Sequence, residues 1–501
     1  MYSNRFSNID QIIKLYSKQN PNKICLIYEN IDLGYSEQLT YKEFDKYISK
    51  ASNFLISEKL KLKSKLMISL PNSLVHLIFL FACFRSGIIA VTVNPNLTDR
   101  ELKYQFNKSK SDLIISIDDK SHITKNNILL NDISLNYLDD LLDRFDSTYA
   151  EIKLKGENEA SILFTSGTTN LPKGVISTQY SYLNKIANVT THLQMNSEDR
   201  HYLTLPIFHT NGQYSLLAIM SVGGSALITS KFSTSNYFKL ARKHKVTLST
   251  LFASTIRMLL MYKKSKLDKV HSIRLIMYAQ SVSQLELDEW NNKFNINIIQ
   301  IYGMSETTGM ISANPLINNR NLSMGKVLPM YDYKILNNQR QLTKPFEIGE
   351  LLIKGEKGIS FMKGYIDDYE ATNDVIKNNY LHTGDMVYKD DDDYIYFVDR
   401  KNDVIKRSGE NISTVEIENV LINYKHVKNV SVVGIPDKIM DYTIVAFIIP
   451  NDTNIDINDI KEFCRINLIP YKIPEKFLVV DTFPTTSVGK IQKYKLIEEY
   501  L

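Results

Sequence analysis

A chain of 501 residues is longer than one hydrophobic core normally serves, so two or more domains are expected. Its composition, with 44% apolar and 23% charged residues, is that of an ordinary soluble globular protein. The net charge of +5 is small for this length and argues against a dedicated nucleic-acid-binding protein, which concentrates lysine and arginine on one face or tail.

The cysteines indicate the redox compartment of the protein, and the apolar segments indicate whether it spans a membrane. Cys25, Cys83 and Cys464 are odd in number, far apart and without metal-ligand spacing, so reduced thiols in a cytoplasmic protein are expected. The N-terminus lacks the basic-then-apolar pattern of a signal peptide. The most apolar helix candidate, residues 74–84, is much shorter than the about 20 residues of a membrane helix, so we expect a buried core helix and no transmembrane segment.

Short apolar, β-branched runs alternate with helical patterns along the first part of the chain. Near its start, Thr40 and Glu43 have the spacing of a capping box, and apolar residues then recur at helical spacing from Phe44 to Leu55. Buried strands are expected at residues 66–70, 88–93, 113–117, 161–164, 226–229, 246–251, 274–278 and 296–301. The alternation predicts an α/β fold with largely parallel sheets.

From about residue 343 the pattern changes to closely spaced strands and turns. Strands are expected at residues 349–355 and 394–398, and the acidic run of residues 390–393 between them is interpreted as a solvated turn rather than a cation site. A smaller unit is expected to begin near Asn402. Its predicted elements are strands at residues 430–435, 444–449 and 477–480 and a helix at residues 457–467.

The most informative stretch follows the strand at residues 161–164. It reads Thr165-Ser166-Gly167-Thr168-Thr169-Asn170-Leu171-Pro172-Lys173-Gly174. Glycines let backbone N–H groups approach a phosphate, hydroxyls donate hydrogen bonds, and lysine supplies charge. A polar surface loop shares this composition, but the full string is rare by chance. It is not a Walker loop, because the lysine follows a proline and no Lys-Ser/Thr pair opens a helix. The stretch predicts a polyphosphate-binding loop.

The string Ser166-Gly167-Thr168-Thr169-x-x-Pro172-Lys173-Gly174 resembles the phosphate loop of the acyl-adenylate-forming (AMP-binding) superfamily. That superfamily includes acyl-CoA synthetases, firefly luciferases and the adenylation domains of peptide synthetases. Two departures are Asn170, where the family usually has glycine, and Gln179, in the likely place of a histidine. Asn tolerates left-handed backbone well, so the turn is expected to survive. The resemblance implies that the phosphates of ATP are bound by Thr165, Ser166, Gly167, Thr168, Thr169 and Lys173.

Two further motifs follow in the family's order. Tyr302-Gly303-Met304-Ser305-Glu306-Thr307 resembles the adenine/magnesium motif. The resemblance implies that Tyr302 and Gly303 lie at the adenine, that Glu306 holds Mg²⁺, and that Thr307 donates to the α-phosphate. Upstream, Leu205-Pro206-Ile207-Phe208-His209 matches a motif whose aromatic/His pair borders the acyl pocket and its gate, although a lone histidine is more often structural.

The C-terminal motifs complete the resemblance, which covers about residues 10–495. Asp385, in Leu381-His382-Thr383-Gly384-Asp385, is expected to accept hydrogen bonds from the ribose hydroxyls, and Arg400 to lie near the ribose and phosphate. Lys406-Arg407-Ser408-Gly409-Glu410-Asn411-Ile412 resembles a loop of the pantetheine tunnel, so Lys406 and Gly409 are expected to contact CoA; the alternative is a basic surface turn. Lys490, in Pro484-Thr485-Thr486-Ser487-Val488-Gly489-Lys490, matches the adenylation lysine.

The resemblance also implies a domain organisation. Residues 1–401 would form the AMP-binding domain, with parallel-rich sheets flanked by helices and a smaller barrel-like β part. Residues 403–501 would form a small mobile α+β domain. The hinge is expected at Asn402, where the family usually has Asp or Lys.

The implied activity is that of an ATP-dependent acid–CoA ligase with Mg²⁺ as cofactor and an acid, ATP and CoA as substrates. The candidates for catalysis are Lys490, Thr165, Lys173, Glu306 and His209. The surroundings of the motifs look closest to carnitine/crotonobetaine-CoA ligases, on strings such as Ile256-Arg257-Met258-Leu259-Leu260 and Val433-Gly434-Ile435-Pro436-Asp437. The acid would be betaine-like or a short- or medium-chain acid. Aromatic faces for a trimethylammonium group could come from Tyr214, Tyr278 and Phe208, which core packing explains equally well.

Three alternatives stay open. A freestanding adenylation domain that loads an amino or aryl acid onto a carrier protein would need an Asp near the start of the pocket, and residues 209–213 offer Asn211 but no Asp. A luciferase-like oxygenase would use the same scaffold. A nucleotide-binding pseudoenzyme is favoured only by Asn170, Gln179 and Asn402. An oligomer is possible in each case.

Overall fold

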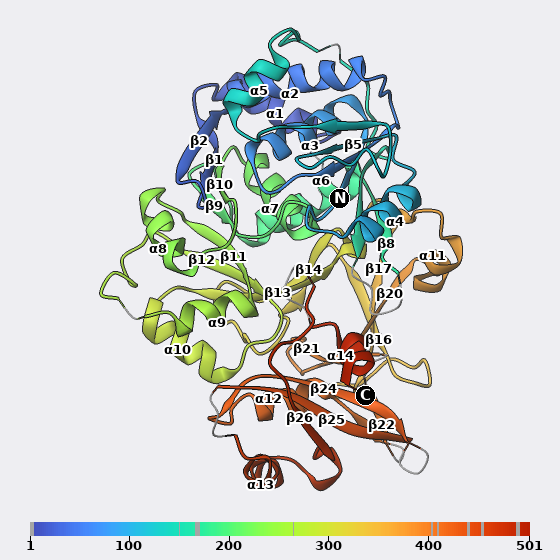
Figure 1. Ribbon diagram of the computed structural model, residues 1–501. Helices are drawn as coiled ribbons and strands as arrows, with labels where there is room; N and C mark the ends of the chain where they lie inside the picture. The colour runs from blue at the N-terminus through green and yellow to red at the C-terminus, as the bar shows by residue number, and fades with distance from the viewer. Residues whose placement is uncertain are drawn as a thin grey trace. The chain divides into compact units, whose positions relative to one another are not determined.

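The computed structural model describes residues 5–149, 151–165, 171–263, 265–401, 404–407, 410–437, 441–451, 455–486 and 491–500 (Figure 1). The chain forms two compact units, which are described separately. The first contains Met1–Thr165, Pro172–Asp332 and Lys354–Leu381. The second contains Tyr333–Ile353 and His382–Leu501. The expected boundary at Asn402 falls outside the described residues and stays a prediction.

The first unit contains a nine-stranded sheet in the order β15-β14-β13-β12-β11-β9-β10-β1-β2. The strands from β13 to β1 pair in parallel, and antiparallel strands complete both edges. Parallel strands are buried on both faces, which explains their continuous apolar runs. The bounds are β1 Ile24–Asn30, β2 Tyr35–Thr40, β9 Arg200–Leu203, β10 Ser225–Thr229, β11 Leu248–Phe252, β12 Leu275–Ala279, β13 Ile298–Met304, β14 Gly309–Ala313 and β15 Lys326–Val327.

A seven-stranded sheet in the order β18-β8-β7-β4-β3-β5-β6 belongs to the same unit. Its strands from β7 to β6 are parallel, whereas β8 and β18 are antiparallel additions at the β7 edge. The bounds are β3 Lys65–Ser69, β4 Ile89–Thr92, β5 Leu113–Ser116, β6 Asn127–Leu129, β7 Glu159–Thr165, β8 Lys173–Thr178 and β18 Gly364–Tyr365. The two sheets confirm the predicted parallel-rich α/β organisation.

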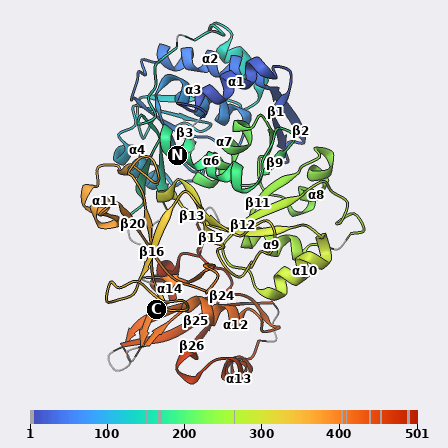
Figure 2. The same cartoon turned by 180° about the vertical axis from the view of Figure 1, so that it is seen from behind.

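Helices cover these sheets, and α1, α2 and α3 lie close together in both views (Figures 1 and 2). The predicted capping box begins α2, where the Thr40 backbone N–H donates to Glu43 Oε2 at 2.8 Å. Every residue of α3 is buried, as predicted, and burial lowers the pKa of its His76 to about 4, so this side chain is neutral at pH 7. The helices are α1 Asp10–Gln19, α2 Tyr41–Ser57, α3 Leu74–Ser86, α4 Asp99–Ser109, α5 Leu135–Leu142, α6 Gln179–His192, α7 Thr210–Ser221, α8 Thr234–Lys243, α9 Ala253–Met261, α10 Gln284–Phe294, η1 Ser305–Thr307 and α11 Tyr369–Val375.

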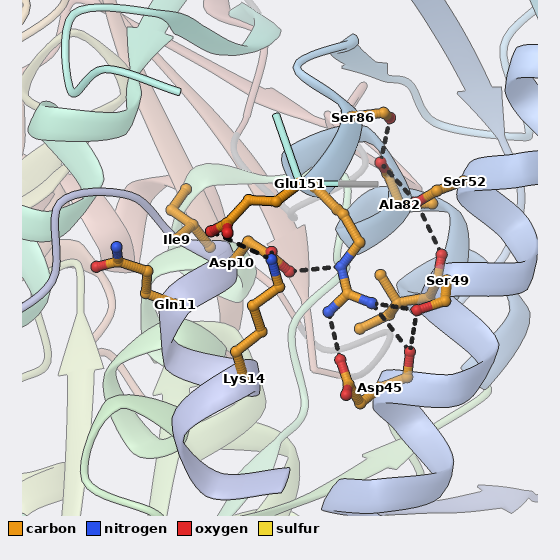
Figure 3. A network of polar contacts seen from close by, with 12 residues as sticks. Ile9, Asp10, Gln11, Lys14, Asp45, Ser49, Ser52, Ala82, Ser86 and Glu151 are labelled. Atoms are coloured by element: carbon orange, nitrogen blue, oxygen red, sulfur yellow. Dashed lines mark hydrogen bonds and ion pairs between the residues drawn. The ribbon is translucent and has the colours of Figure 1, made fainter. Parts of the chain in front are cut away.

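One buried arginine ties α1, α2 and α3 together. Arg85 Nε donates to Asp10 Oδ1 at 2.6 Å, and the guanidinium also donates to Ser49 Oγ at 2.7 Å and to the carboxylate of Asp45. Figure 3 shows Asp10, Asp45 and Ser49 turned toward this centre, with Lys14 beside Asp10. Charges this deeply buried are stable only when they are paired.

The second unit contains a sheet of β16 Asp332–Leu336, β17 Gly349–Lys354 and β20 Tyr380–Lys389, with β21 Ile395–Arg400 paired antiparallel to β20. The short strand β19 Ile376–Lys377 belongs to the first unit, as do its partners Tyr380 and Leu381 at the start of β20. The acidic run forms the β20–β21 turn, in which Asp390 Oδ1 accepts from the backbone N–H of Tyr394 at 2.9 Å. The prediction of a turn at residues 390–393 is therefore confirmed.

The remainder of the second unit is an α+β arrangement. Its three-stranded sheet has the order β24-β25-β26, and α12 packs against β24 over Ile417, Leu421 and Val432. The predicted helix at residues 457–467 is observed as α13. The bounds are β22 Ile405–Arg407, β23 Glu410–Ile412, α12 Thr414–Leu421, β24 Val427–Asp437, β25 Asp441–Pro450, α13 Ile457–Asn467, η2 Pro470–Lys472, β26 Lys476–Val479 and α14 Lys493–Tyr500.

Two further expectations can be compared with the structure. Cys25, Cys83 and Cys464 are buried and free, in agreement with the expected unpaired thiols. In the part of the chain that the structure describes, no helix combines the length and the apolar composition needed to cross a membrane.

Candidate active site

The expected phosphate loop is the turn of the β7–β8 hairpin. Thr165 and Lys173 are register partners, so strand pairing continues up to both ends of the loop. Thr165 Oγ1 donates to the Lys173 carbonyl oxygen at 3.4 Å, and the Tyr104 hydroxyl donates to the Pro172 carbonyl oxygen at 3.2 Å. The structure therefore fixes where the loop begins and ends. The loop residues Ser166, Gly167, Thr168, Thr169 and Asn170 lie outside the described residues, and their contacts with phosphate stay predictions.

The predicted magnesium residue lies in a tight turn. Glu306 is in η1, directly after β13, and only 8% of its surface is exposed. Thr307 Oγ1 lies 2.9 Å from the Met304 carbonyl oxygen and 2.6 Å from the Gly309 carbonyl oxygen, and its single proton is shared between these two acceptors within the turn. The Met362 backbone N–H donates to the Glu306 carbonyl oxygen at 2.7 Å. The expected hydrogen bond from Thr307 to the α-phosphate stays a prediction, because in this structure the Thr307 hydroxyl contacts backbone carbonyl oxygens of the turn.

Tyr365, which lies in none of the sequence motifs described above, contacts two of the predicted site residues. Its hydroxyl donates to Glu306 Oε1 at 2.7 Å, and Lys173 Nζ lies 5.1 Å from the centroid of its ring. Tyr365 reaches this position because β18 pairs with β8, where Tyr365 is the register partner of Val175. No local sequence signal marks it, since its importance comes from the pairing of distant strands. We call these three residues the Lys173–Tyr365–Glu306 group.

Tyr302 and Gly303 end the strand that leads to Glu306. β13 and β14 pair antiparallel, with a register shift between Tyr302 and Gly303. A Cβ atom on Gly303 would come within 2.2 Å of the Gly309 carbonyl oxygen, so only glycine permits this approach of the two strands. Close packing of the two strands thus explains why residue 303 is a glycine. The adenine-binding role of Tyr302 stays a prediction.

The segment before α7 places Phe208 and His209 side by side, with ring centroids 4.6 Å apart. Gln213, which is fully buried, connects this segment to β4 of the seven-stranded sheet and to α6. Its Nε2 donates to Thr92 Oγ1 in β4 at 2.9 Å and to the Ile207 carbonyl oxygen at 3.0 Å, and its Oε1 accepts from the Tyr182 hydroxyl. The hydrogen bonds of Gln213 therefore hold the segment that carries the aromatic/His pair, and the place of this pair at an acyl pocket stays a prediction.

Gln179, the second departure from the family pattern, has a structural partner. It is 1% exposed at the start of α6, and its Oε1 accepts a hydrogen bond from the backbone N–H of Ile9 at 2.9 Å. The amide thus anchors the N-terminal segment to the helix that follows the β7–β8 hairpin.

In the second unit, the predicted ribose-binding pair is formed by facing residues of β20 and β21. Asp385 and Arg400 are register partners, and Arg400 Nε lies 2.7 Å from Asp385 Oδ1. Asp385 is fully buried, and its backbone N–H donates to Thr383 Oγ1 at 3.1 Å. An ionised carboxylate accepts hydrogen bonds and does not donate them, as the expected bonds from the ribose hydroxyls require, and this role of Asp385 stays a prediction.

The neighbouring carboxylate has a different partner. Asp399 Oδ2 accepts from the backbone N–H and from the hydroxyl of Thr414, at 2.6 and 2.8 Å, and the Ser413 hydroxyl donates to the Val398 carbonyl oxygen at 2.6 Å. These bonds join the end of β21 to the beginning of α12. They connect the residues before Asn402 with those after it.

The remaining predicted residues cannot be placed. Asn402, Gly409, Lys490 and the side chain of Lys406 lie outside the described residues. Their roles at the hinge, at CoA and in adenylation stay predictions.

The described residues fit Mg²⁺ bound together with a nucleotide. Within the described ranges, no group of three or more His, Cys, Asp or Glu side chains could hold a metal ion. Mg²⁺ commonly uses one or two carboxylates and completes its octahedron with phosphate oxygens and water. The single buried carboxylate of Glu306 is suited to such an ion.

A buried lysine supports the strand that follows Glu306. Lys185, in α6, donates from Nζ to the Met310 carbonyl oxygen and to the Tyr331 hydroxyl, both at 2.6 Å. Its Nζ also lies 4.7 Å from the centroid of the Tyr331 ring. Burial lowers the pKa of Lys185 well below its usual value of 10.5, because the charged form is poorly solvated there.

This burial predicts a pH dependence that Lys185→Met should remove. Between the lowered pKa of the folded state and 10.5, the unfolded chain binds a proton that the folded chain does not. The free energy of unfolding should therefore rise with pH more steeply in the wild type than in the variant, by up to about 1.4 kcal/mol per pH unit. Denaturant unfolding at a series of pH values below 10.5, followed by fluorescence of the single tryptophan, the buried Trp290, measures the difference. Parallel pH profiles for the two proteins would contradict it.

Comparison with known proteins defines the class of the chain. Residues 14–366 match the AMP-binding enzyme family, and residues 416–490 match the AMP-binding enzyme C-terminal domain. The chain therefore belongs to the AMP-binding enzyme family. This confirms the resemblance to acyl-adenylate-forming enzymes that the motifs indicated.

Several relatives of the chain are acid–CoA ligases or synthetases. A crotonobetaine/carnitine–CoA ligase from Citrobacter koseri is 30% identical over 511 residues, which cover 97% of each chain. The o-succinylbenzoate coenzyme A synthetase (MenE) from Bacillus subtilis, solved with ATP and a magnesium ion, is 27% identical, with a TM-score of 0.86 over 97% of this chain and 99% of that one. ATP-bound MatB from Rhodopseudomonas palustris has a TM-score of 0.89 over 98% and 99% of the chains at 22% identity, which supports the fold alone. The relatives confirm the fold class and the prediction of an acyl-CoA ligase.

Proposed function

We propose that the chain is an ATP- and Mg²⁺-dependent acid–CoA ligase that acts in two steps. A carboxylate oxygen attacks the α-phosphorus of ATP, and the bond to pyrophosphate breaks, which gives an acyl adenylate. The sulfur of CoA then attacks the acyl carbon, the thiol proton is released to solvent, and AMP leaves. Such barriers fall mainly through positioning and charge neutralisation.

The observation that carries the proposal is the Lys173–Tyr365–Glu306 group beside the ends of the predicted phosphate loop. It brings one cation and one carboxylate to the end of the β7–β8 hairpin. A lysine ammonium about 4 Å from a phosphate charge gains roughly 4 kcal/mol at an effective dielectric constant near 20. Mg²⁺ at Glu306 would neutralise further phosphate charge when bound.

The other roles follow the family's motifs. Asp385 would accept from the ribose hydroxyls and Arg400 would lie near the ribose and phosphate, while Lys406 and Gly409 would contact CoA. Lys490 would bridge the carboxylate and the α-phosphate in the first step. Lys490 and the loop of Gly409 belong to the same predicted C-terminal domain and cannot both act at one time, so the proposal includes a rotation about Asn402 between the steps.

For the acid, we propose a betaine-like or a short- or medium-chain carboxylate. The named ligases that share 29% to 30% of their residues with the chain act on crotonobetaine and carnitine, whereas MenE acts on o-succinylbenzoate. Of the three aromatic candidates for a betaine, Tyr278 is fully buried and donates to the Asn321 carbonyl oxygen at 2.7 Å. Tyr214 is buried against Gly309, and Phe208 is only partly buried. Phe208 is therefore the best of the three to contact a trimethylammonium group.

The test is ATP–pyrophosphate exchange with a panel of acids, followed by detection of the thioester with CoA. The panel contains crotonobetaine, carnitine, o-succinylbenzoate and straight-chain acids of increasing length. We expect exchange with at least one acid and a CoA thioester of the same acid. Exchange without a CoA thioester would favour the carrier-protein alternative, and no exchange with any acid would favour the pseudoenzyme.

A further inference from the structure

We propose that Tyr365 is a positioning residue that sets Lys173 and Glu306 for MgATP at the same time. The inference rests on the proposed function, because it assigns Lys173 to phosphate and Glu306 to the metal. Tyr365 itself would act through these two side chains.

The position of the Tyr365 ring is fixed from several sides. Its backbone N–H donates to Thr372 Oγ1 at 2.9 Å, and Thr372 Oγ1 donates to the Asp368 carbonyl oxygen at 2.8 Å. Tyr365 is 9% exposed and packs in a cluster with Val175 of β8. The rest of that cluster consists of Phe361, Met362, Ile376 and Leu381. A side chain held in this way can impose its geometry on its neighbours.

The hydroxyl of Tyr365 orients the carboxylate of Glu306. It donates to Oε1 at 2.7 Å, and a hydrogen bond to an ionised acceptor is stronger than one between neutral groups. No described residue donates a hydrogen bond to the second oxygen, Oε2. The tyrosine therefore fixes the rotation of the carboxylate while Oε2 stays available to a cation.

The face of the same ring attracts Lys173. The ammonium lies 5.1 Å from the ring centroid, within the range of a cation–π contact. Lysine has a long flexible side chain, and Lys173 begins β8 at the end of the predicted phosphate loop. The ring thus favours a position of the ammonium over its face.

Two substitutions separate the two contacts. Tyr365→Phe keeps the ring, the packing and the cation–π contact and removes only the hydroxyl. Tyr365→Leu removes the ring as well. The matched control is Tyr47→Phe, which removes a tyrosine–carboxylate hydrogen bond of nearly the same length, 2.8 Å to Asp139 Oδ1, between α2 and α5.

The experiment measures ATP binding by calorimetry without an acid substrate, so that no turnover occurs, once in excess Mg²⁺ and once in EDTA. Tyr365→Phe should weaken binding in Mg²⁺ by about tenfold and leave binding in EDTA unchanged. Tyr365→Leu should also weaken binding in EDTA, by about three- to tenfold. Tyr47→Phe should match the wild type in both buffers.

The inference would be overturned if the Tyr365→Phe variant bound ATP like the wild type in both buffers. It would also be overturned if the variant lost the same factor of ATP affinity in Mg²⁺ and in EDTA. Far-UV circular dichroism establishes that each variant is folded, and if Tyr365→Leu fails to fold, Tyr365→Phe alone decides. A wild type whose ATP binding does not respond to Mg²⁺ would instead count against the proposed function, together with the absence of pyrophosphate exchange.

Discussion

Lys490→Ala is expected to lower acyl-adenylate formation by about 10²–10³-fold, a typical cost of removing one group that stabilises charge in a transition state. The reason is that Lys490 is assigned to the carboxylate and the α-phosphate while they react. Thioester formation from supplied acyl adenylate should largely persist, because a separate surface of the C-terminal domain is assigned to CoA. Pyrophosphate exchange measures the first step, and single-turnover thioester formation measures the second.

The control for this experiment is Lys495→Ala. Lys495 is an exposed lysine on α14, so its loss should leave both steps unchanged. Equal losses of both steps in Lys490→Ala would contradict the scheme of two alternating arrangements.

Arg85→Met is expected to reduce the free energy of unfolding of the first unit by about 3 kcal/mol. The substitution leaves Asp10, whose side chain is 9% exposed, without its closest cation and removes the link between α1, α2 and α3 (Figure 3). Breaking one side of a buried ion pair costs about 3–5 kcal/mol, and the lower end applies because Lys14 Nζ stays 3.0 Å from Asp10 Oδ2. Denaturant unfolding followed by Trp290 fluorescence measures the change, because this tryptophan lies in the core of the first unit.

Arg257→Met provides the matched comparison. Arg257 Nε lies 2.6 Å from Glu286 Oε1, the same distance as in the Arg85–Asp10 pair, but the Arg257 side chain is 38% exposed, against 2% for Arg85. Exposed pairs contribute about 0–1 kcal/mol, so this variant should unfold almost like the wild type. Equal losses in the two variants would mean that burial does not set the strength of the Arg85 pair.

The sequence predicted those parts of the fold that local patterns encode. Residues 66–70 and 113–117 were expected as strands and are observed as β3 and β5 within one residue at each end, because buried parallel strands are continuous apolar runs. The strands β2 and β18 were not predicted. β2 is polar at an edge of its sheet, and β18 has two residues that become a strand only by pairing with β8.

The same distinction applies to the site. Short contiguous motifs indicated Lys173 and Glu306, and the structure connects the two. Tyr365 and Lys185 could not be found in this way, because their contacts depend on sheet pairing and helix packing between distant segments. The local sequence around a single tyrosine or lysine does not indicate which distant residues will contact it in the folded protein.

The bonds that Asp399 makes to Thr414 bear on how often the proposed rotation occurs. A rotation about Asn402 that separated β21 from α12 would break both of these bonds to a buried carboxylate. At about 1.5 kcal/mol for each bond to a charged group, these two bonds alone would favour the bonded arrangement by on the order of 100-fold. A substrate that needs the other arrangement must bind it more tightly by a similar factor, and its apparent affinity is lower than its intrinsic affinity in the same proportion.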